Sequence, residues 1–178
     1  MKLQRTLTAC LFLTLASVLP LAAADEKKLQ SDAQNAVAAF KKSDPSLEKH
    51  FKSAAGYAVF PNVGKGGFIV GGAHGNGVLY EGGKAVGTTS LTQVSVGAQI
   101  GGQEFSEVIF FEDKKALDSF KDKEWAMAAG VGAVAAASGA SANAKYNQGV
   151  MVFTLAKAGL MAEASIGGQK FKYEAFKK

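Results

Sequence analysis

The chain has 178 residues and a formal net charge of +5, and removal of an expected leader would leave about 154 residues for one domain with a buried core. Cys10 is the only cysteine and Arg5 the only arginine, and both lie in that leader. Disulfides, thiolate catalysis and cysteine-bound zinc are therefore excluded from the remaining chain, which can bind anions only through lysine side chains and the backbone. Its charge falls to +3 without Lys2 and Arg5, which is too weak to predict a nucleic-acid partner.

Residues 1–24 have the pattern of a secretory signal peptide. A short basic start precedes an apolar run over residues 7–21, and three alanines at 22–24 supply a small-residue cleavage site. Cys10 could suggest a lipoprotein, but most of the apolar run follows it, which is the wrong order. We therefore expect export, with Asp25 as the mature N-terminus and a location in the periplasm or outside the cell, free or at a membrane surface.

The segment Asp25–Ser53 predicts two helices. Apolar side chains recur at helical spacing between Leu29 and Phe40. Asp44 and Pro45 then predict a stop and a restart, because aspartate is a preferred N-cap and proline is favoured at the first helical position.

From Gly56 onward the apolar period changes from that of a helix to that of a strand. One short helix, over residues 113–121, interrupts the series, and Gly82–Lys84 is expected to form a hairpin turn. In this pattern Phe68 should lie in the core and Lys65 in an exposed glycine turn. The predicted strands are 57–60 (ended by Pro61), 68–73, 77–81, 92–101, 107–111, 150–156, 160–166 and 170–174.

The expected fold is α+β, with N-terminal helices packed on a strongly twisted antiparallel sheet and one short inserted helix. It forms a single domain over 25–178, helical over 25–54 and mainly β over 55–178. Periodicity leaves open whether the sheet closes into a barrel. Residues 126–144 are nearly all Ala, Gly and Ser. A flexible linker, a helix, and a strand packed close to another layer all remain open for this segment.

Neither the glycine clusters nor the histidines predict an enzyme. Gly64–Gly67 begins like a dinucleotide-binding loop but lacks the third glycine and a following helix. His50 and His74 are the only histidines, and neither has a carboxylate at metal-ligand spacing. His74 followed by glycine is similar to the start of an oxyanion loop, but the chain has no Gly-x-Ser-x-Gly motif. We predict no catalytic residue, no metal site and no cofactor, and keep a hydrolase using His74 as a distant third hypothesis.

Charge is unevenly distributed along the chain. Residues 104–124 carry a net charge of −3, and their acids, Glu104 and Glu107 among them, are expected on a solvated face. Residues 125–178 carry +4, and lysines alternate with aromatics over 170–178. This alternation suits an anionic membrane, near which a lysine is worth about 1 kcal/mol. An ordinary final strand with lysines outward and aromatics inward fits equally well.

Glycine- and aromatic-rich segments are spread along the expected mature chain in a recognisable order. They are Ala55–Phe68, Gly71–Val78, Val96–Gly101, Glu107–Phe111, Val152–Leu160 and Ala164–Gly168. No single segment is specific, but the ordered set resembles the SYLF-domain family, most of all its exported bacterial branch. The family comprises lipid-binding domains, and its eukaryotic members include actin regulators.

The resemblance implies an α+β domain that binds anionic or phosphoinositide-type lipid, with the N-terminal helix taking part, and it favours a strand for residues 126–144. Lys65 and Lys157 match lysines of the family pattern. Two departures weigh against phosphoinositide specificity and actin binding. Ala158 replaces a second basic residue of the eukaryotic members, and Ser141–Asn143 replaces their Gly-Arg-Asn step.

We therefore predict a non-enzymatic lipid-binding module of the cell envelope, with anionic membrane lipid as its partner. Lysine side chains and the backbone amides of glycine turns would bind the headgroups. The alternative is a structural or protein-interaction domain with an envelope protein as its partner. The predicted lipid-binding residues are Lys65, Gly66, Gly67, Lys157, Lys170 and Lys172, with Lys27, Lys28, Lys41 and Lys42 on the N-terminal helix.

Overall fold

A computed structural model describes residues 19–67, 70–96, 102–122, 124–128, 130–158 and 168–177. The N-terminal part is helical, as predicted, with α1 (Leu19–Ser43) followed by a 3₁₀ turn η1 (Pro45–Leu47) and α2 (Glu48–Ser53). The Asp44 side chain accepts a hydrogen bond from the Ser46 N–H and caps η1, which confirms the predicted restart. α1 runs without a break through Asp25, the predicted mature N-terminus.

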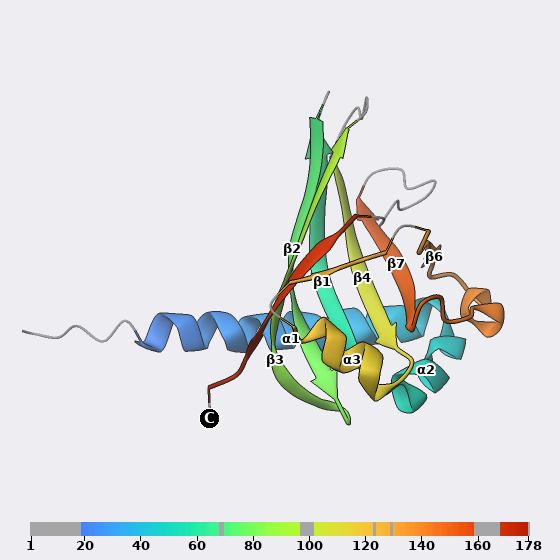
Figure 1. Ribbon diagram of the computed structural model, residues 1–178, viewed down its shortest axis with the longest axis horizontal. Coiled ribbons are helices and arrows are strands. Elements are labelled where there is room, and N and C mark those ends of the chain that lie inside the picture. Colours follow the sequence, from blue (N-terminus) through green and yellow to red (C-terminus); the bar gives the residue numbers. More distant parts are fainter. Residues whose placement is uncertain are drawn as a thin grey trace, which may run out of the picture.

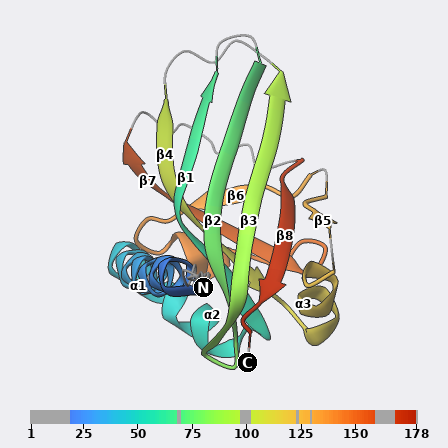
Figure 2. The same ribbon diagram turned by 90° about the vertical axis from the view of Figure 1, so that its left-hand side faces the viewer.

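The β part is one curled, half-barrel sheet of eight strands with the order β5-β8-β3-β2-β1-β4-β7-β6 (Figures 1 and 2). Neighbouring strands are antiparallel except β6 and β7, which are parallel. The inserted helix α3 (Lys114–Phe120) follows β4, as predicted. The strands are β1 (Gly56–Gly67), β2 (Val70–Glu81), β3 (Lys84–Val96), β4 (Gln103–Phe111), β5 (Trp125–Ala126), β6 (Ala133–Ala135), β7 (Val150–Ala158) and β8 (Lys170–Ala175).

The predicted end of the first strand at Pro61 is wrong, because β1 continues to Gly67 past a bulge. The register with β2 shifts between Val59 and Asn62. A bulge lets a strand accommodate a proline, which has no N–H for the ladder. The Pro61 carbonyl accepts a hydrogen bond of 2.8 Å from the Ser106 hydroxyl on β4. The glycine turn expected at residues 64–67 is therefore part of a strand.

The predicted break before residue 77 is also wrong, since β2 is continuous from Val70 to Glu81. Glycine at positions 75 and 77 allows β2 to pack closely against β1. A Cβ at either would lie 2.8 or 2.5 Å from a backbone oxygen of β1. The hairpin turn is confirmed by left-handed backbone at Gly82 (φ 57°) and Gly83 (φ 77°). Phe68, the end of the strand predicted at 92–101, and the strand predicted at 160–166 lie outside the described residues.

Residues 126–144 form mostly irregular structure that is fastened to the helical part. Among the described residues of this segment, only Ala126, in β5, and Ala133–Ala135, in β6, belong to strands, and Ala140–Asn143 forms a second 3₁₀ turn, η2. Asp44 is fully buried, and its carboxylate accepts hydrogen bonds from the N–H groups of Ser141 (2.7 Å) and Gly139 (3.2 Å). Burial alone would raise the pKa of Asp44, but the hydrogen bonds from Ser46 and Ser141 hold it well below its usual range.

The curl gives the sheet an inner and an outer face, each with its own apolar core. Phenylalanines dominate the inner core: Phe60, Phe105, Phe111, Phe120 and Phe171. The outer core lies between the lower part of the sheet and α1, which contributes Ala33, Ala36 and Phe40. α1 crosses the sheet near one end, and the strands extend well beyond it (Figure 1). We call the end of the sheet at Gly67 and Val70 the upper end.

The inner face also holds a buried acid, contrary to the expectation that Glu107 is solvated. Glu107 is fully buried, and its Oε2 accepts a hydrogen bond of 3.0 Å from Gln169 Nε2. Its Oε1 has no hydrogen-bond partner among the residues that the structure describes. Gln169 precedes β8, so this contact crosses the inside of the curl from β4. Burial raises the pKa of Glu107 to about 7, with the Gln169 hydrogen bond acting in the opposite direction.

We expect Asp44→Ala to destabilise the fold by about 3 kcal/mol, because several buried N–H and O–H groups would lose a charged acceptor. Residues 136–144 should become more accessible to proteases. Chemical denaturation and limited proteolysis measure the two effects. Asp118→Ala is the control, since Asp118 makes only an exposed ion pair with Lys114. A variant as stable as the control would show that the Asp44 hydrogen bonds do not anchor this segment.

Stability should fall as the pH rises from about 4.5 to about 7, because the folded chain holds the Glu107 proton more tightly than the unfolded chain does. The loss attributable to Glu107 should be at most about 3 kcal/mol. Glu107→Gln should abolish it and be more stable than the wild type above pH 7 or so. Denaturant titrations on either side of this range measure it, with the exposed Glu104→Gln as control. Equal pH dependence in wild type and Glu107→Gln would refute the assignment.

Candidate functional site

Lys65, which the sequence predicts in an exposed glycine turn, is buried. It lies in β1 with 9% of its surface exposed, on the inner face with Val63. No hydrogen bond or ion pair to Lys65 is found within the described part of the chain. The open glycine turn whose backbone amides were expected to bind headgroups is absent at Gly64 and Lys65, because both are paired with β2 on one side and β4 on the other. These residues cannot bind a headgroup as an open turn would.

The helix lysines do not form a single patch. Lys28 donates a hydrogen bond of 2.8 Å to Asp32 one turn later, which neutralises its charge locally. Lys41 lies near the other end of α1, with its ammonium 5.3 Å from the centre of the Phe51 ring. Lys27 and Lys42 are exposed and make no ion pair among the described residues.

The strand lysines, in contrast, lie on the outer face of the sheet. Lys170 and Lys172 on β8 and Lys157 on β7 are exposed and make no ion pair within the described ranges. Lys157 donates to the side-chain oxygen of Asn62 at the β1 bulge. In the register of the sheet, Lys170 lies beside Thr92 of β3 and Lys157 lies near the upper end of β4. These two lysines therefore flank the part of the outer face above α1.

We call this area the upper outer face. Most of the residues that its strands present outward have small or short side chains. Val94 is 77% exposed, and no other large hydrophobic side chain of the described residues is comparably exposed. The face is defined by Gly64, Gly66, Gly72, His74, Thr92 and Val94, with Lys157 and Lys170 at its flanks.

Two glycines of the upper outer face have no structural reason to be glycine. A Cβ at Gly64 or Gly66 would meet no atom within 4 Å, and both residues have ordinary extended backbone. Glycine in a strand costs about 0.5–1 kcal/mol relative to alanine. Glycine there is typical of places where another molecule approaches the backbone closely. The contrast with Gly75 and Gly77, which their own neighbours require, makes this area a candidate binding surface.

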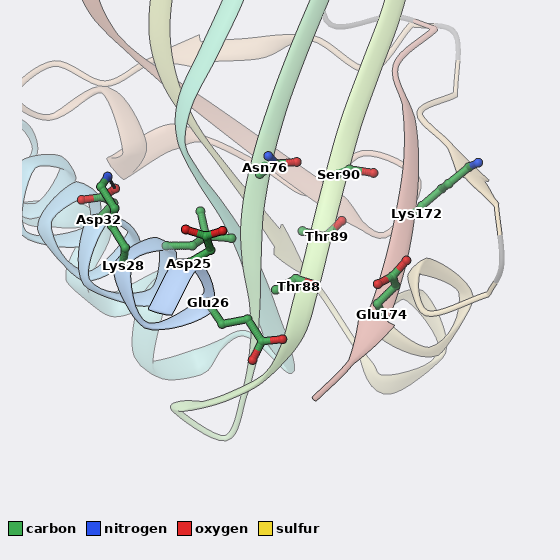
Figure 3. A pocket seen from close by; sticks show the side chains of 11 residues that line it. Asp25, Glu26, Lys28, Asp32, Asn76, Thr88, Thr89, Ser90, Lys172 and Glu174 are labelled. Atoms are coloured by element: carbon green, nitrogen blue, oxygen red, sulfur yellow. Dashed lines mark hydrogen bonds and ion pairs between the residues drawn. The ribbon is translucent and has the colours of Figure 1, made fainter. Parts of the chain in front are cut away.

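Two grooves lie beside α1, one along its N-terminal half and one along its middle. One groove, of about 460 Å³, separates α1 from β8, and its floor is formed by β2 and β3 (Figure 3). Four carboxylates line it, against only two ammonium groups, so it is not a cationic site. The other groove, of about 500 Å³, lies on the β7 side of α1 and includes Lys157. Sequence reasoning missed both grooves, because they depend on where α1 crosses the sheet.

The hydrolase hypothesis gains no support from the position of His74. Its side chain is exposed in the middle of β2, and within the described residues it makes no hydrogen bond to a hydroxyl or carboxylate. The described residues contain no group of three or more metal-ligating side chains. Among them there is likewise no helix of the length and apolarity needed to cross a membrane.

Comparison with known proteins agrees with the resemblance seen in the sequence. Residues 92–175 match the model of the Ysc84 family, described as "Las17-binding protein actin regulator". The chain is also 33% identical over 130 residues to "Beta cell expansion factor A" of Aeromonas veronii. That alignment covers 71% of this chain and 49% of the relative, so the chain spans about half the length of the curated relative. The chain belongs to the Ysc84 family, which is the SYLF-domain family that its sequence resembles.

Proposed function

We propose that this protein is a non-enzymatic lipid-binding module that rests its upper outer face on anionic membranes. The observation that carries the proposal is the composition of that face. Gly64 and Gly66, which the fold does not require to be glycine, lie on β1 between two exposed lysines, and the exposed side chain of Val94 lies on the same face two strands away. The lysines would attract anionic headgroups, and the backbone left uncovered at Gly64 and Gly66 would allow close approach. Family membership supports a lipid-binding or actin-regulator-like domain in general terms.

The binding should be weak and sensitive to salt. At about 1 kcal/mol for each lysine near the surface, Lys157, Lys170 and neighbouring lysines provide a few kcal/mol, which corresponds to millimolar affinity. Residues 25–178 contain no arginine, so this part of the chain cannot hold a phosphate through a bidentate guanidinium contact. We therefore propose anionic phospholipid in general as the ligand. Phosphoinositide selectivity remains a prediction from the family resemblance.

Export to the cell envelope is part of the proposal. The proposal of export rests on the signal-like pattern of residues 1–24. The upper outer face and the grooves beside α1 do not depend on export. The alternative function, a scaffold for an envelope protein, would use the same uncovered sheet face as a protein interface. Binding to protein-free vesicles separates the two functions.

Reversing the two flanking charges, Lys157→Glu with Lys170→Glu, should reduce co-sedimentation with anionic vesicles about tenfold or more at low salt. The matched control is Lys84→Glu with Lys145→Glu, which changes the net charge equally at two exposed lysines outside this face. Wild type and control should bind alike and should lose most binding at about 0.5 M salt, where screening is strong. Equal loss in both double variants would mean that only net charge matters. Wild-type binding to neutral vesicles as strong as to anionic ones would refute the lysine mechanism.

A further inference from the structure

Two buried polar side chains meet inside the curl and connect strands that are not neighbours in the sheet. Glu107 of β4 and Gln169, directly before β8, are both fully buried, and Gln169 Nε2 donates a hydrogen bond of 3.0 Å to Glu107 Oε2. Three strands, β3, β2 and β1, separate β8 from β4 in the sheet order. The hydrogen bond therefore spans the inside of the curl. We call Glu107 and Gln169 the acid–amide pair.

The two remaining oxygens of the acid–amide pair are unsatisfied. Glu107 Oε1 and Gln169 Oε1 are buried and have no hydrogen-bond partner among the residues that the structure describes. An ionised carboxylate only accepts hydrogen bonds, and so does an amide oxygen. With Glu107 ionised, the pair therefore contains two buried acceptors without a donor, which costs free energy. A proton on Glu107 Oε1 turns one of these acceptors into a donor.

A carboxylic acid and a primary amide are complementary hydrogen-bonding groups. The amide N–H donates to one carboxyl oxygen, which is the bond that the structure shows, and the acid O–H can donate to the amide oxygen. The protonated pair can thus satisfy itself without any other group. Ionisation of Glu107 removes the O–H donor and leaves a negative charge inside the apolar inner core.

This charge would have no opposite charge bonded to it. In the register of the sheet, Glu107 lies beside Phe60 of β1 and Thr154 of β7. β5 and β6 contain no titratable residue, and the charged side chains of α3 are exposed. The other titratable side chains on the inner face, among the described residues, are Lys65 and Tyr173. Neither makes a hydrogen bond or ion pair with Glu107 in this part of the chain, and the Tyr173 hydroxyl donates to a backbone carbonyl.

We infer that the acid–amide pair is a pH-dependent switch. It holds β5 and β8 against β4 while Glu107 is protonated and releases these two strands when Glu107 ionises. Gln169 is joined to β5 through the backbone, because its carbonyl accepts a hydrogen bond of 2.8 Å from the N–H of Met127. β5 has two residues and pairs only with β8 among the described strands. Loss of the Gln169 contact therefore acts first on this edge of the sheet.

The released form should be populated at neutral and higher pH. Burial raises the pKa of Glu107 to about 7, whereas a carboxyl freed from the pair would titrate near its ordinary value of about 4.5. Between these values the edge opens with loss of a proton, so the opening equilibrium should increase up to about tenfold per pH unit. Above about pH 7 it should level off, because Glu107 is then ionised in both forms. This inference does not depend on the proposed membrane function.

Amide hydrogen exchange under native conditions tests the switch. After correction for the intrinsic pH dependence of exchange, protection of residues 125–127 and 170–175 should fall about tenfold or more between about pH 5 and pH 7.5. At the higher pH these amides should be less protected than those of β1 and β2. Their exchange should also be insensitive to low concentrations of denaturant, because a local opening exposes little surface.

Glu107→Gln is the decisive variant, because two primary amides can form the same pair of hydrogen bonds at every pH. Its edge amides should be as protected at about pH 7.5 as those of the wild type at about pH 5. The exposed Glu104→Gln, also on β4, is the matched control and should behave like the wild type. Carbon-13 NMR of the wild-type carboxyl groups gives an independent measurement, in which one glutamate should titrate near pH 7 or so.

Three results would overturn the inference. The first is wild-type edge protection that does not change with pH, or a change that persists in Glu107→Gln. The second is exchange of the edge amides only through global unfolding, with the same denaturant dependence as β1 and β2. The third is a wild type in which no glutamate titrates within about one unit of pH 7.

Discussion

The packing of α1 across the outer face of the curled sheet determines which surfaces of this protein are available. The helix presents Ala33, Ala36 and Phe40 to β1 and β2, and small alanines let it lie close to the strands. Because it crosses near one end, it covers the lower outer core and leaves the upper outer face open (Figure 1). The same crossing creates a groove on each side of the helix. The candidate surfaces on the outer face all follow from this one contact.

The outer face carries two kinds of electrostatic surface. Above α1, Lys157 and Lys170 flank the upper outer face, where Glu104 is the only acid among the outward residues described. Beside α1, carboxylates of the helix and of β8 exceed the lysines. A net charge of +3 for the expected mature chain hides this difference. An approaching anionic membrane would therefore be attracted to one part of this face and repelled by another.

Local signals predicted local features well. Asp44 and Pro45 marked the restart of the helix, and Gly82–Gly83 marked the hairpin, because caps and left-handed turns depend on a few adjacent residues. The α+β class followed from the change of period at Gly56. Features that depend on distant residues were missed. The β1 bulge at Pro61 needs β2 and β4 as partners, and the segment over 126–144 takes its path from Asp44.

In the candidate site, too, features set by adjacent residues were predictable from the sequence, whereas features set by distant residues were not. That the strand lysines point outward could be anticipated from alternation with aromatics, and Lys170 and Lys172 are indeed exposed. The glycines on both sides of Lys65 predict a turn, and a lysine in a turn is expected to be exposed. Those glycines extend a strand instead, and strand alternation then places Lys65 inside the curl. Glu107 followed the same rule, since it shares a face with Phe105 and Ile109. Only the register of the whole sheet identifies which face is covered.

The central claim is that the upper outer face lies against the membrane, and a single fluorescent label tests it most directly. A chain beginning at Asp25 contains no cysteine, so Val94→Cys can carry one environment-sensitive fluorophore. Lys84→Cys, in the hairpin at the opposite end of the sheet, gives the reference position. The account predicts that anionic vesicles shift the emission of the label at position 94 to the blue, whereas the label at position 84 stays unchanged. A shift at position 84 alone, or equal shifts at both positions, would contradict it.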